Sequence, residues 1–400
     1  MRIFIQSDPA VTPLPSSTPT TTSSPPRKKP PLVCQMTSPN HVTSPAEKSS
    51  IINSAMPEPG LCDYIVLDIP QTPDGKYKRD GYAFLKVHGS TTKYMFSVNY
   101  PSDELLTSLH TFLGKATLTD TGREILQTVP LRGFGFLSEV ARLTASSSSR
   151  DSLANYAGDL RFYYERFTEV LRGLGVAKGE VINFFAFKPV KLASRPGPYE
   201  GLLEYLNNMP GDNLHLVMIL TITTEKGRLV QPSSSWDKHC LASDSEPTIK
   251  DAVELIAKVK SPVFTFALTL SLRFDTFEGV MVARLGTTEL QTVLSTARRS
   301  LGYANECGNL HAGIAVHRIT NAAVGECAFA LYRTMSVATF ETSESVEEKV
   351  RLAYETLDLL KATDHTVGWL VYNVTGGLAP ASCGGSQHRL KKIREIIDTR

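Results

Sequence analysis

The sequence predicts an α+β protein with two mainly antiparallel β-rich domains, packed helices and a disordered N-terminal arm. Three observations indicate this class: a Pro/Ser/Thr-rich beginning, strands with period-two alternation, and amphipathic helices that follow strand pairs. The chain has 400 residues, of which 42% are hydrophobic, so it is long enough for two cores and a tail. We expect an arm at 1–58, a first domain at 59–230, a linker at 231–247 and a second domain at 248–400.

The arm at residues 1–58 is too poor in apolar residues to offset the entropy cost of ordering it. Its one basic cluster, Arg27, Lys28 and Lys29, is flanked by prolines. This cluster is either part of a solvated linker or a docking site for an acidic partner, surface or nucleic acid. The beginning of the chain lacks the apolar core of a signal peptide, and no stretch reaches the ~20 apolar residues of a membrane span.

The first domain is expected to combine a hairpin with helices and buried strands. Strands are predicted at 63–69, 82–88, 94–100, 181–187 and 214–223, with the second and third forming the hairpin. Helical signals cover 133–143, and a clear amphipathic helix covers 159–171, where Gly173 can act as the C-cap.

The second domain contains the strongest strand signal in the chain. Phe264, Phe266 and Leu268 begin an apolar row that alternates with Thr and Ser residues, as is typical of an antiparallel strand with one buried face. Further strands are predicted at 280–285, 310–319, 327–339 and 365–374. Helices are predicted at 249–258, 288–297, 346–360 (with a capping box of Ser345 and Glu348) and 389–397.

A similar helix start occurs twice in the chain. Glu104, Leu105, Thr107 and Leu109 recur in the same spacing as Glu289, Leu290, Thr292 and Leu294. This match indicates either a duplicated module or a chance coincidence.

Motifs that could carry chemistry are incomplete. The Gly-x-Gly sequences at 133–135 and 173–175 lack the spacing of a dinucleotide site, so turn and cap glycines explain them. The Gly-rich segment 376–385 is an anion-binding loop or a connector. His239 with Cys240, and His311 with His317, do not form a convincing nucleophilic or metal site. We therefore expect no catalytic residue, metal, cofactor or small-molecule substrate.

The six cysteines are scattered and include no Cys-x-x-Cys pair. This distribution predicts reduced thiols in a cytosolic protein.

Two basic segments are candidates for contact with a membrane or a nucleic acid. Lys188, Lys191 and Arg195 follow an aromatic run, which suits single-stranded nucleic acid but also a buried strand that ends in a solvated loop. The C-terminal helix suits an anionic membrane or docking on its own domain. The formal net charge of +2 argues against a dedicated nucleic-acid binder. The candidate contact residues are Arg27, Lys28, Lys29, Lys188, Lys191, Arg195, Arg389, Lys391, Lys392 and Arg394.

The organisation resembles the matrix proteins of non-segmented negative-strand RNA viruses. The resemblance rests on 263–319, interpreted as hairpin, helix and strand, and on the basic ending Arg389–Arg394. It implies two related β-rich modules, no enzymatic site and a basic C-terminal region. The arm departs from the pattern because it contains no Pro-Pro-x-Tyr or Pro-Thr/Ser-Ala-Pro motif.

The sequence therefore predicts a non-enzymatic, matrix-like viral assembly protein. It would form homo-oligomers and touch an anionic membrane or a nucleoprotein, in the virion and the host cytoplasm, with the nucleus as a further location. The alternative is a nucleic-acid-binding capsid or movement protein. A third hypothesis is an enzyme whose site residues converge only in space.

Overall fold

The computed structural model describes the parts of the chain that form the barrel, its helices and an added sheet. The described residues are 29–36, 56–68, 93–97, 131–137, 150–188, 203, 206–207, 213–222, 234–237, 246–260, 264–278, 297–301, 316–319, 327–331, 336–362, 364–372, 374 and 387–400.

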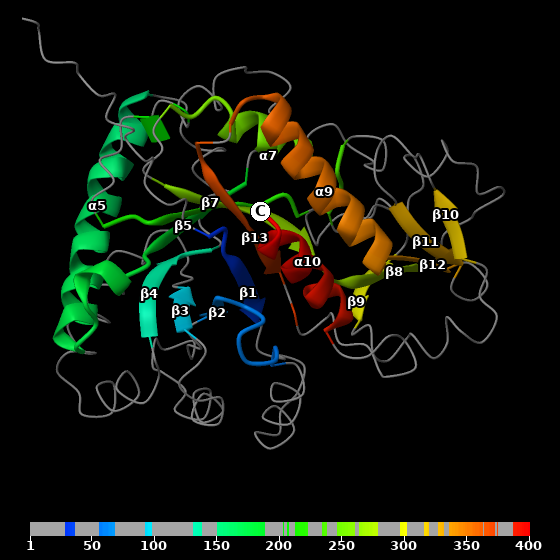
Figure 1. The fold of residues 1–400 in the computed structure, drawn as a ribbon, viewed down its shortest axis with the longest axis horizontal. Coiled ribbons are helices and arrows are strands. Elements are labelled where there is room, and N and C mark those ends of the chain that lie inside the picture. The colour runs from blue at the N-terminus through cyan, green and yellow to red at the C-terminus, as the bar shows by residue number, and fades with distance from the viewer. Residues whose placement is uncertain are drawn as a thin grey trace, which may run out of the picture.

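Eight parallel strands close into a barrel in the order β1-β13-β7-β6-β5-β4-β3-β2 (Figure 1). Strand β1 pairs with β2 on one side and with β13 on the other, so segments from the two ends of the chain complete the ring. The strands are β1 (Leu32–Met36), β2 (Tyr64–Asp68), β3 (Lys93–Ser97), β4 (Leu131–Phe136), β5 (Phe184–Phe187), β6 (Leu216–Ile219), β7 (Thr265–Ser271) and β13 (Thr366–Tyr372).

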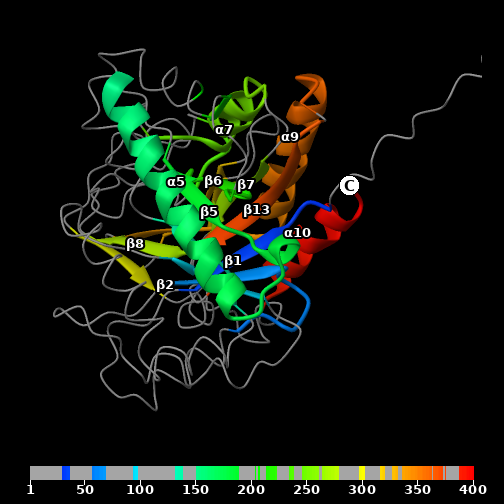
Figure 2. The ribbon, with the colours of Figure 1, turned by 90° about the vertical axis from the view of Figure 1, so that its left-hand side faces the viewer.

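Helices surround the barrel strands (Figure 2). Helix α5 (Arg150–Gly173) connects β4 to β5, followed by the short η2 (Lys178–Glu180), and α7 (Ile249–Ile256) connects β6 to β7. Helix α9 (Ser343–Leu359) precedes β13, and α10 (His388–Asp398) follows it. Capping boxes start α7 at Thr248 and α9 at Thr342, because each cap side chain and the residue three positions later satisfy each other's backbone N–H.

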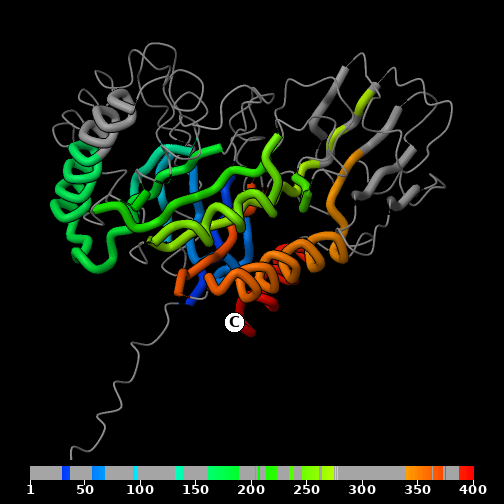
Figure 3. Tube along the Cα trace, turned by 90° about the horizontal axis from the view of Figure 1, so that it is seen from above, coloured from blue at the N-terminus to red at the C-terminus, as the bar shows by residue number. Residues whose placement is uncertain are grey.

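A second, antiparallel sheet is inserted between β7 and α9. Its strand order is β10-β11-β12-β8-β9, and it lies to one side of the barrel (Figures 1 and 3). The strands are β8 (Phe274–Glu278), β9 (Ala297–Leu301), β10 (Val316–Ile319), β11 (Cys327–Leu331) and β12 (Ser336–Phe340).

The barrel strands bury both of their faces. Outward side chains pack under the helices, as where Phe134 of β4 stacks on Phe167 of α5 with ring centroids 5.0 Å apart. Inward side chains form a separate cluster in the barrel lumen, which includes Val33, Val66, Met95, Phe184, Ala186, Met218, Ala267 and Leu370.

The glycines of β4 make room for Phe184 in the lumen. A Cβ atom on Gly135 would lie 2.0 Å from the carbonyl oxygen of Phe184 and 2.6 Å from its Cγ. On Gly133 it would lie 1.8 Å from the carbonyl oxygen of Ile182. No side chain larger than hydrogen fits either position unless β5 moves away.

The predicted fold of two antiparallel domains with a disordered arm was wrong. All eight barrel strands are parallel, β1 lies inside the stretch expected to be disordered, and strands from both sides of 231–247 share one ring. The physical reason is visible in β7, where the apolar residues Phe266, Leu268 and Leu270 face the helices. The alternating Thr269 and Ser271 are fully buried, so the polar face is the barrel interior, not solvent.

Individual elements were predicted better than their pairing. The amphipathic helix after residue 159, the helix from Ile249, the strand from His365 and the basic C-terminal helix are confirmed. The helix expected at 133–143 was wrong, since 131–136 is β4. Strand β8 at Phe274–Glu278 was not predicted. Strand β3 pairs in parallel with β2 and β4, so it belongs to no hairpin, and α9 is capped by Thr342 with Ser345. The two repeated helix starts lie outside the described residues.

A buried ion pair fastens the inserted sheet to the barrel. Lys349 of α9 lies 2.6 Å from Glu341, which directly follows β12, and both residues are 1% exposed. The ammonium also donates to the carbonyl oxygen of Ser234, and the hydroxyls of Ser234 and Ser345 donate to the carboxylate. Arg389 of α10 donates to the Glu341 carbonyl oxygen. The network therefore joins the sheet, two helices and the β6–α7 connection.

Replacing Gly135 by Ala should lower the free energy of unfolding by about 1–3 kcal/mol, because the added methyl group overpacks the lumen against β5. The urea midpoint of the variant measures this loss. Gly173→Ala is the matched control, since a Cβ there meets nothing within 4 Å. Equal midpoints for Gly135→Ala and the natural protein would contradict the tight contact between β4 and β5.

Replacing Lys349 by Met should cost about 3–5 kcal/mol of stability, because it leaves the Glu341 carboxylate buried without its cation. Arg351→Met removes an exposed cation from the same helix and should cost about 1 kcal/mol or less. Lys349→Met/Glu341→Gln should recover part of the loss. Similar midpoints for Lys349→Met and Arg351→Met would show that the network contributes little.

Candidate functional site

The carboxyl ends of parallel barrel strands are where barrel enzymes place their active sites. Side chains alternate along a strand, so the lumen cluster fixes which positions at these ends point inward. We call these inward positions the barrel mouth; those with described side chains are Gln35 of β1, Ser97 of β3, Leu137 after β4, Lys188 after β5, Leu220 after β6, Ser271 of β7 and Tyr372 of β13. The same alternation on β2 leads to Asp68, whose side chain is not among those described.

Hydrogen bonds from backbone N–H groups connect two mouth residues, Ser97 and Ser271, to their surroundings. The Ser97 hydroxyl accepts a hydrogen bond from the Leu137 N–H at 3.2 Å, which ties the end of β3 to the end of β4. The N–H of Ser271 donates to the hydroxyl of Ser234, which belongs to the Glu341 network. The mouth is therefore rigidly connected to the junction with the inserted sheet.

Lys188 is the charged residue among the mouth side chains that the structure describes. It is 8% exposed, and its ammonium donates to the Glu246 carboxylate at 2.8 Å. Glu246 lies just before α7, and in a β/α barrel a helix begins at the carboxyl end of the strand before it. The pair thus joins the end of β5 to the segment that follows β6.

The end of β4 is apolar as far as it is described. Its inward positions are Gly133, Gly135 and the buried Leu137. A carboxyl group from β4 would therefore have to come from the segment after Leu137, where the next acidic residue in the sequence is Glu139. Glu139 lies outside the described residues.

The described residues contain no cluster of three or more His, Cys, Asp or Glu side chains able to hold a metal ion. No helix among them combines the length and the apolar character needed to cross a bilayer. Within this part of the chain, the chemistry of the mouth consists of hydroxyl, amide, phenol and ion-paired groups. Such groups suit recognition of a ligand rich in oxygen atoms.

The basic residues predicted as contact sites do not gather in one place. Lys188 is at the mouth, while Lys29 and the cations of α10 pair with acidic groups near the two chain ends: Lys29 with Asp398, Lys391 with Glu58, Lys392 with Glu395, and Arg394 with Asp63 and Asp398. Arg389 is buried against the Glu341 carbonyl. Arg27, Lys28, Lys191 and Arg195 lie outside the described residues. Contact of any of these residues with membrane or nucleic acid stays a prediction.

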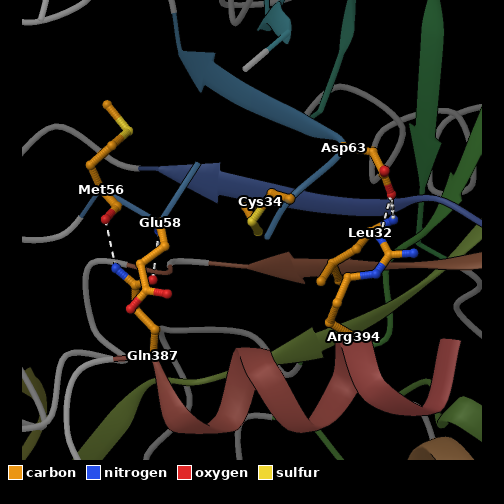
Figure 4. The surroundings of a disulfide bond; sticks show 8 residues. Leu32, Cys34, Met56, Glu58, Asp63, Gln387 and Arg394 are labelled. Carbon is orange, nitrogen blue, oxygen red and sulfur yellow. Dashed lines mark hydrogen bonds and ion pairs between the residues drawn. A yellow bond between two sulfur atoms is a disulfide. The ribbon is translucent and has the colours of Figure 1, made fainter. Parts of the chain in front are cut away.

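A disulfide joins β1 to the segment just before β2 (Figure 4). Cys34 and Cys62 form this bond across Cα atoms 6.0 Å apart, so the expectation of reduced thiols was wrong for this pair. Such bonds persist in oxidising compartments. The predicted location in a virion or host cytoplasm stays a prediction.

Gln387, the N-cap of α10, and Arg394, in the middle of that helix, both bind the same segment (Figure 4). The Gln387 side chain donates to the carbonyl oxygen of Met56 and accepts from the N–H of Glu58. Arg394 donates to Asp63 at 2.6 Å, and Asp63 accepts from the N–H of Leu32 at 2.7 Å. The hydrogen bond from Arg394 holds the pKa of Asp398 below its usual range.

Sequence reasoning found Lys188 but missed the other mouth residues. Gln35, Ser97 and Tyr372 stand at the ends of short strands, where each is polar or half polar after an apolar inward position, and Ser271 follows the polar inward residue Thr269. That pattern is a usable signal only when the strands are known to be parallel. The segments around His239, Cys240 and His311, and the Gly-rich segment 376–385, lie outside the described residues.

Comparison with solved structures places this fold among chitinase-like barrels. The second catalytic domain of a group II chitinase from Ostrinia furnacalis matches with a TM-score of 0.61 and 13% identity, over 93% of this chain and 97% of that one. A GH18 chitinase from Cycas revoluta, solved with (GlcNAc)4, matches with a TM-score of 0.57 and 11% identity, over 92% and 99%. Human YKL-39, described as a pseudo-chitinase with retained chitooligosaccharide binding, matches with 0.56 and 13%, over 93% and 100%.

No family model matches the sequence, and no curated protein matches it. At these identities the structural likeness establishes the fold of the chain, a chitinase-like barrel with an inserted sheet.

These matches correct the functional predictions. The resemblance to viral matrix proteins was wrong, because the neighbours are chitinase-like barrels. The predictions of a viral assembly role, with nucleic-acid binding as its alternative, and of a non-enzymatic protein are contradicted by the same matches. The predicted partners, with no small-molecule substrate, are contradicted because the neighbours bind chitooligosaccharides.

Replacing Arg394 by Met should destabilise the protein by about 1–3 kcal/mol near neutral pH, because Asp63 and Asp398 lose a charged donor. The lowered pKa of Asp398 means that its contribution is present above the pKa of the unfolded chain and is lost as the pH falls through the folded-state pKa. The difference between variant and natural protein should therefore shrink in acid, as urea midpoints at several pH values will show. Lys392→Met, which removes an exposed pair, is the control. A difference that grows in acid would contradict the assignment.

Proposed function

We propose that this chain binds N-acetylglucosamine oligosaccharides at the mouth of its barrel and hydrolyses them. One observation carries the proposal: the fold of this chain matches, over more than nine-tenths of its length, chitinases solved in complex with such ligands. Barrel enzymes place their sites at the carboxyl ends of the strands, where this chain has the phenol of Tyr372 and the Lys188–Glu246 pair.

The mouth suits an uncharged sugar. The phenol of Tyr372 can donate to or accept from hydroxyl or acetamido groups, and Lys188 is neutralised by Glu246. Gln35 and Ser97 are fully buried, so they support the mouth and do not contact a ligand directly. Tyr372 is half-buried beside the lumen cluster, so it can offer an aromatic surface as well as a phenol.

Cleavage of a glycosidic bond needs a proton donor for the leaving oxygen. Glu139 is our candidate, since it is the first acidic residue after β4 and the inward positions of β4 before it are Gly133, Gly135 and Leu137. In substrate-assisted glycosidases the substrate itself, and not a second carboxylate, supplies the nucleophile. An N-acetylated sugar carries such a group, whereas a plain glucose oligomer does not. A glutamate-to-leucine variant of the Ostrinia domain was solved with an N-acetylated chitooligosaccharide, which supports choosing a glutamate for the test.

The test measures binding and cleavage separately. Calorimetry with (GlcNAc)4 and with the matching glucose tetramer gives the affinities, and chromatography of the sugar gives the hydrolysis rate. Glu139→Gln should lower the rate by about 10²–10⁴-fold, the range for loss of a general acid, with little change in Kd. Glu165→Gln, at an exposed position on α5, is the matched control and should change neither quantity.

The outcomes separate the two halves of the proposal. Failure of the natural protein to bind (GlcNAc)4 overturns the whole proposal. Binding without any cleavage overturns hydrolysis and leaves binding in place. Equal affinity for the glucose tetramer overturns the preference for an acetamido group.

A further inference from the structure

The Lys188 ammonium is buried, yet few of its donors are satisfied. An ammonium has three N–H donors. Among the residues that the structure describes, Glu246 is the one hydrogen-bond partner of this group. Leaving a buried charged donor without an acceptor is costly, so a ligand or water oxygen at the mouth is needed to complete its hydrogen bonding.

Lys188 occupies an inward position at the end of β5, so its ammonium lies on the lumen side of the barrel wall. Phe184 and Ala186 belong to the lumen cluster, and Lys188 is the next residue that the alternation of side chains places on the same face. The N–H of Leu220 donates to the Phe187 carbonyl oxygen at 2.7 Å, so the strand-like pairing of β5 with β6 continues to the residue before Lys188.

Glu246 lies in the connection between β6 and β7 and fixes the position of the Lys188 side chain. The two side chains are 10% and 12% exposed, so solvent screens the pair weakly. Glu246 precedes Thr248, whose capping box with Asp251 anchors the start of α7. A lysine held in this way loses little rotamer freedom when a ligand arrives.

Resting on the function proposed above, we propose that Lys188 is a substrate-positioning residue of the mouth. Its ammonium, oriented and neutralised by Glu246, donates hydrogen bonds to the acetamido or hydroxyl oxygens of an uncharged N-acetylated sugar. The deacetylated sugar lacks the acetamido oxygen that would accept this hydrogen bond. Lys188 therefore favours the acetylated ligand.

The experiment compares affinities for (GlcNAc)4 and for its fully deacetylated form by calorimetry. Lys188→Met/Glu246→Gln removes both charges together, so no unpaired charge is left buried. This variant should bind (GlcNAc)4 about tenfold more weakly, the value of a lost charge-assisted hydrogen bond, and should discriminate less between the two sugars. Lys188→Gln, which keeps a donor beside Glu246, should retain part of the affinity and is the second variant if the first does not fold.

Lys391→Met is the matched control, because it removes an ion-paired lysine from α10 and should leave both affinities unchanged. A folded variant of either kind that binds and discriminates like the natural protein overturns the role of Lys188, and the proposed function stands. Absence of (GlcNAc)4 binding in the natural protein overturns both.

Discussion

The backbone pairing of β1 with β13 is the contact on which the rest of the structure depends. It sets Leu32 beside Trp369 and Cys34 beside Val371, and it closes the ring between strands separated by most of the chain. Without it the lumen residues Val33 and Leu370 would lose their enclosure, and the strand ends would no longer converge. The Cys34–Cys62 bond and the Arg394–Asp63 pair both reinforce this seam, since one lies on β1 and the other ties α10 to the segment beside it.

Local patterns in the sequence identified much of the secondary structure but not its arrangement. The apolar face of α5, with Tyr163, Tyr164 and Phe167, follows directly from helical spacing and is buried as expected. Strand β1 escaped notice because five residues after a run of prolines give no periodicity to detect. The polarity of Thr269 and Ser271 was misleading, because a residue that faces a narrow lumen can be polar and fully buried when backbone groups satisfy it. The Thr269 hydroxyl donates to the Ile219 carbonyl oxygen, and the Ser271 hydroxyl accepts from the Arg273 N–H.

The candidate site shows the same division between local and spatial information. Lys188 could be singled out from its neighbours in the sequence, although the charge pattern suggested nucleic acid where the structure gives an internal pair with Glu246. Glu246, Ser97 and Tyr372 belong to the same end of the barrel only because the strands close into a ring. Their spacing in the sequence gives no means of predicting this arrangement. Gly135 was interpreted as a turn residue, while its real constraint is the ring of Phe184 from the next strand.

The inserted sheet leaves and re-enters the barrel through neighbouring strands. Asp275 of β8 lies opposite Thr339 of β12, so the two chain crossings run side by side as a hydrogen-bonded ribbon. An insertion whose two ends lie side by side can change in length or sequence without shifting the register of the barrel strands, because the barrel is affected only by the distance between those two ends. The outer strands of the added sheet should therefore tolerate substitutions and changes in length without loss of the barrel. The junction around Glu341 should not, because it depends on a buried charge and on the hydroxyl groups that donate to it.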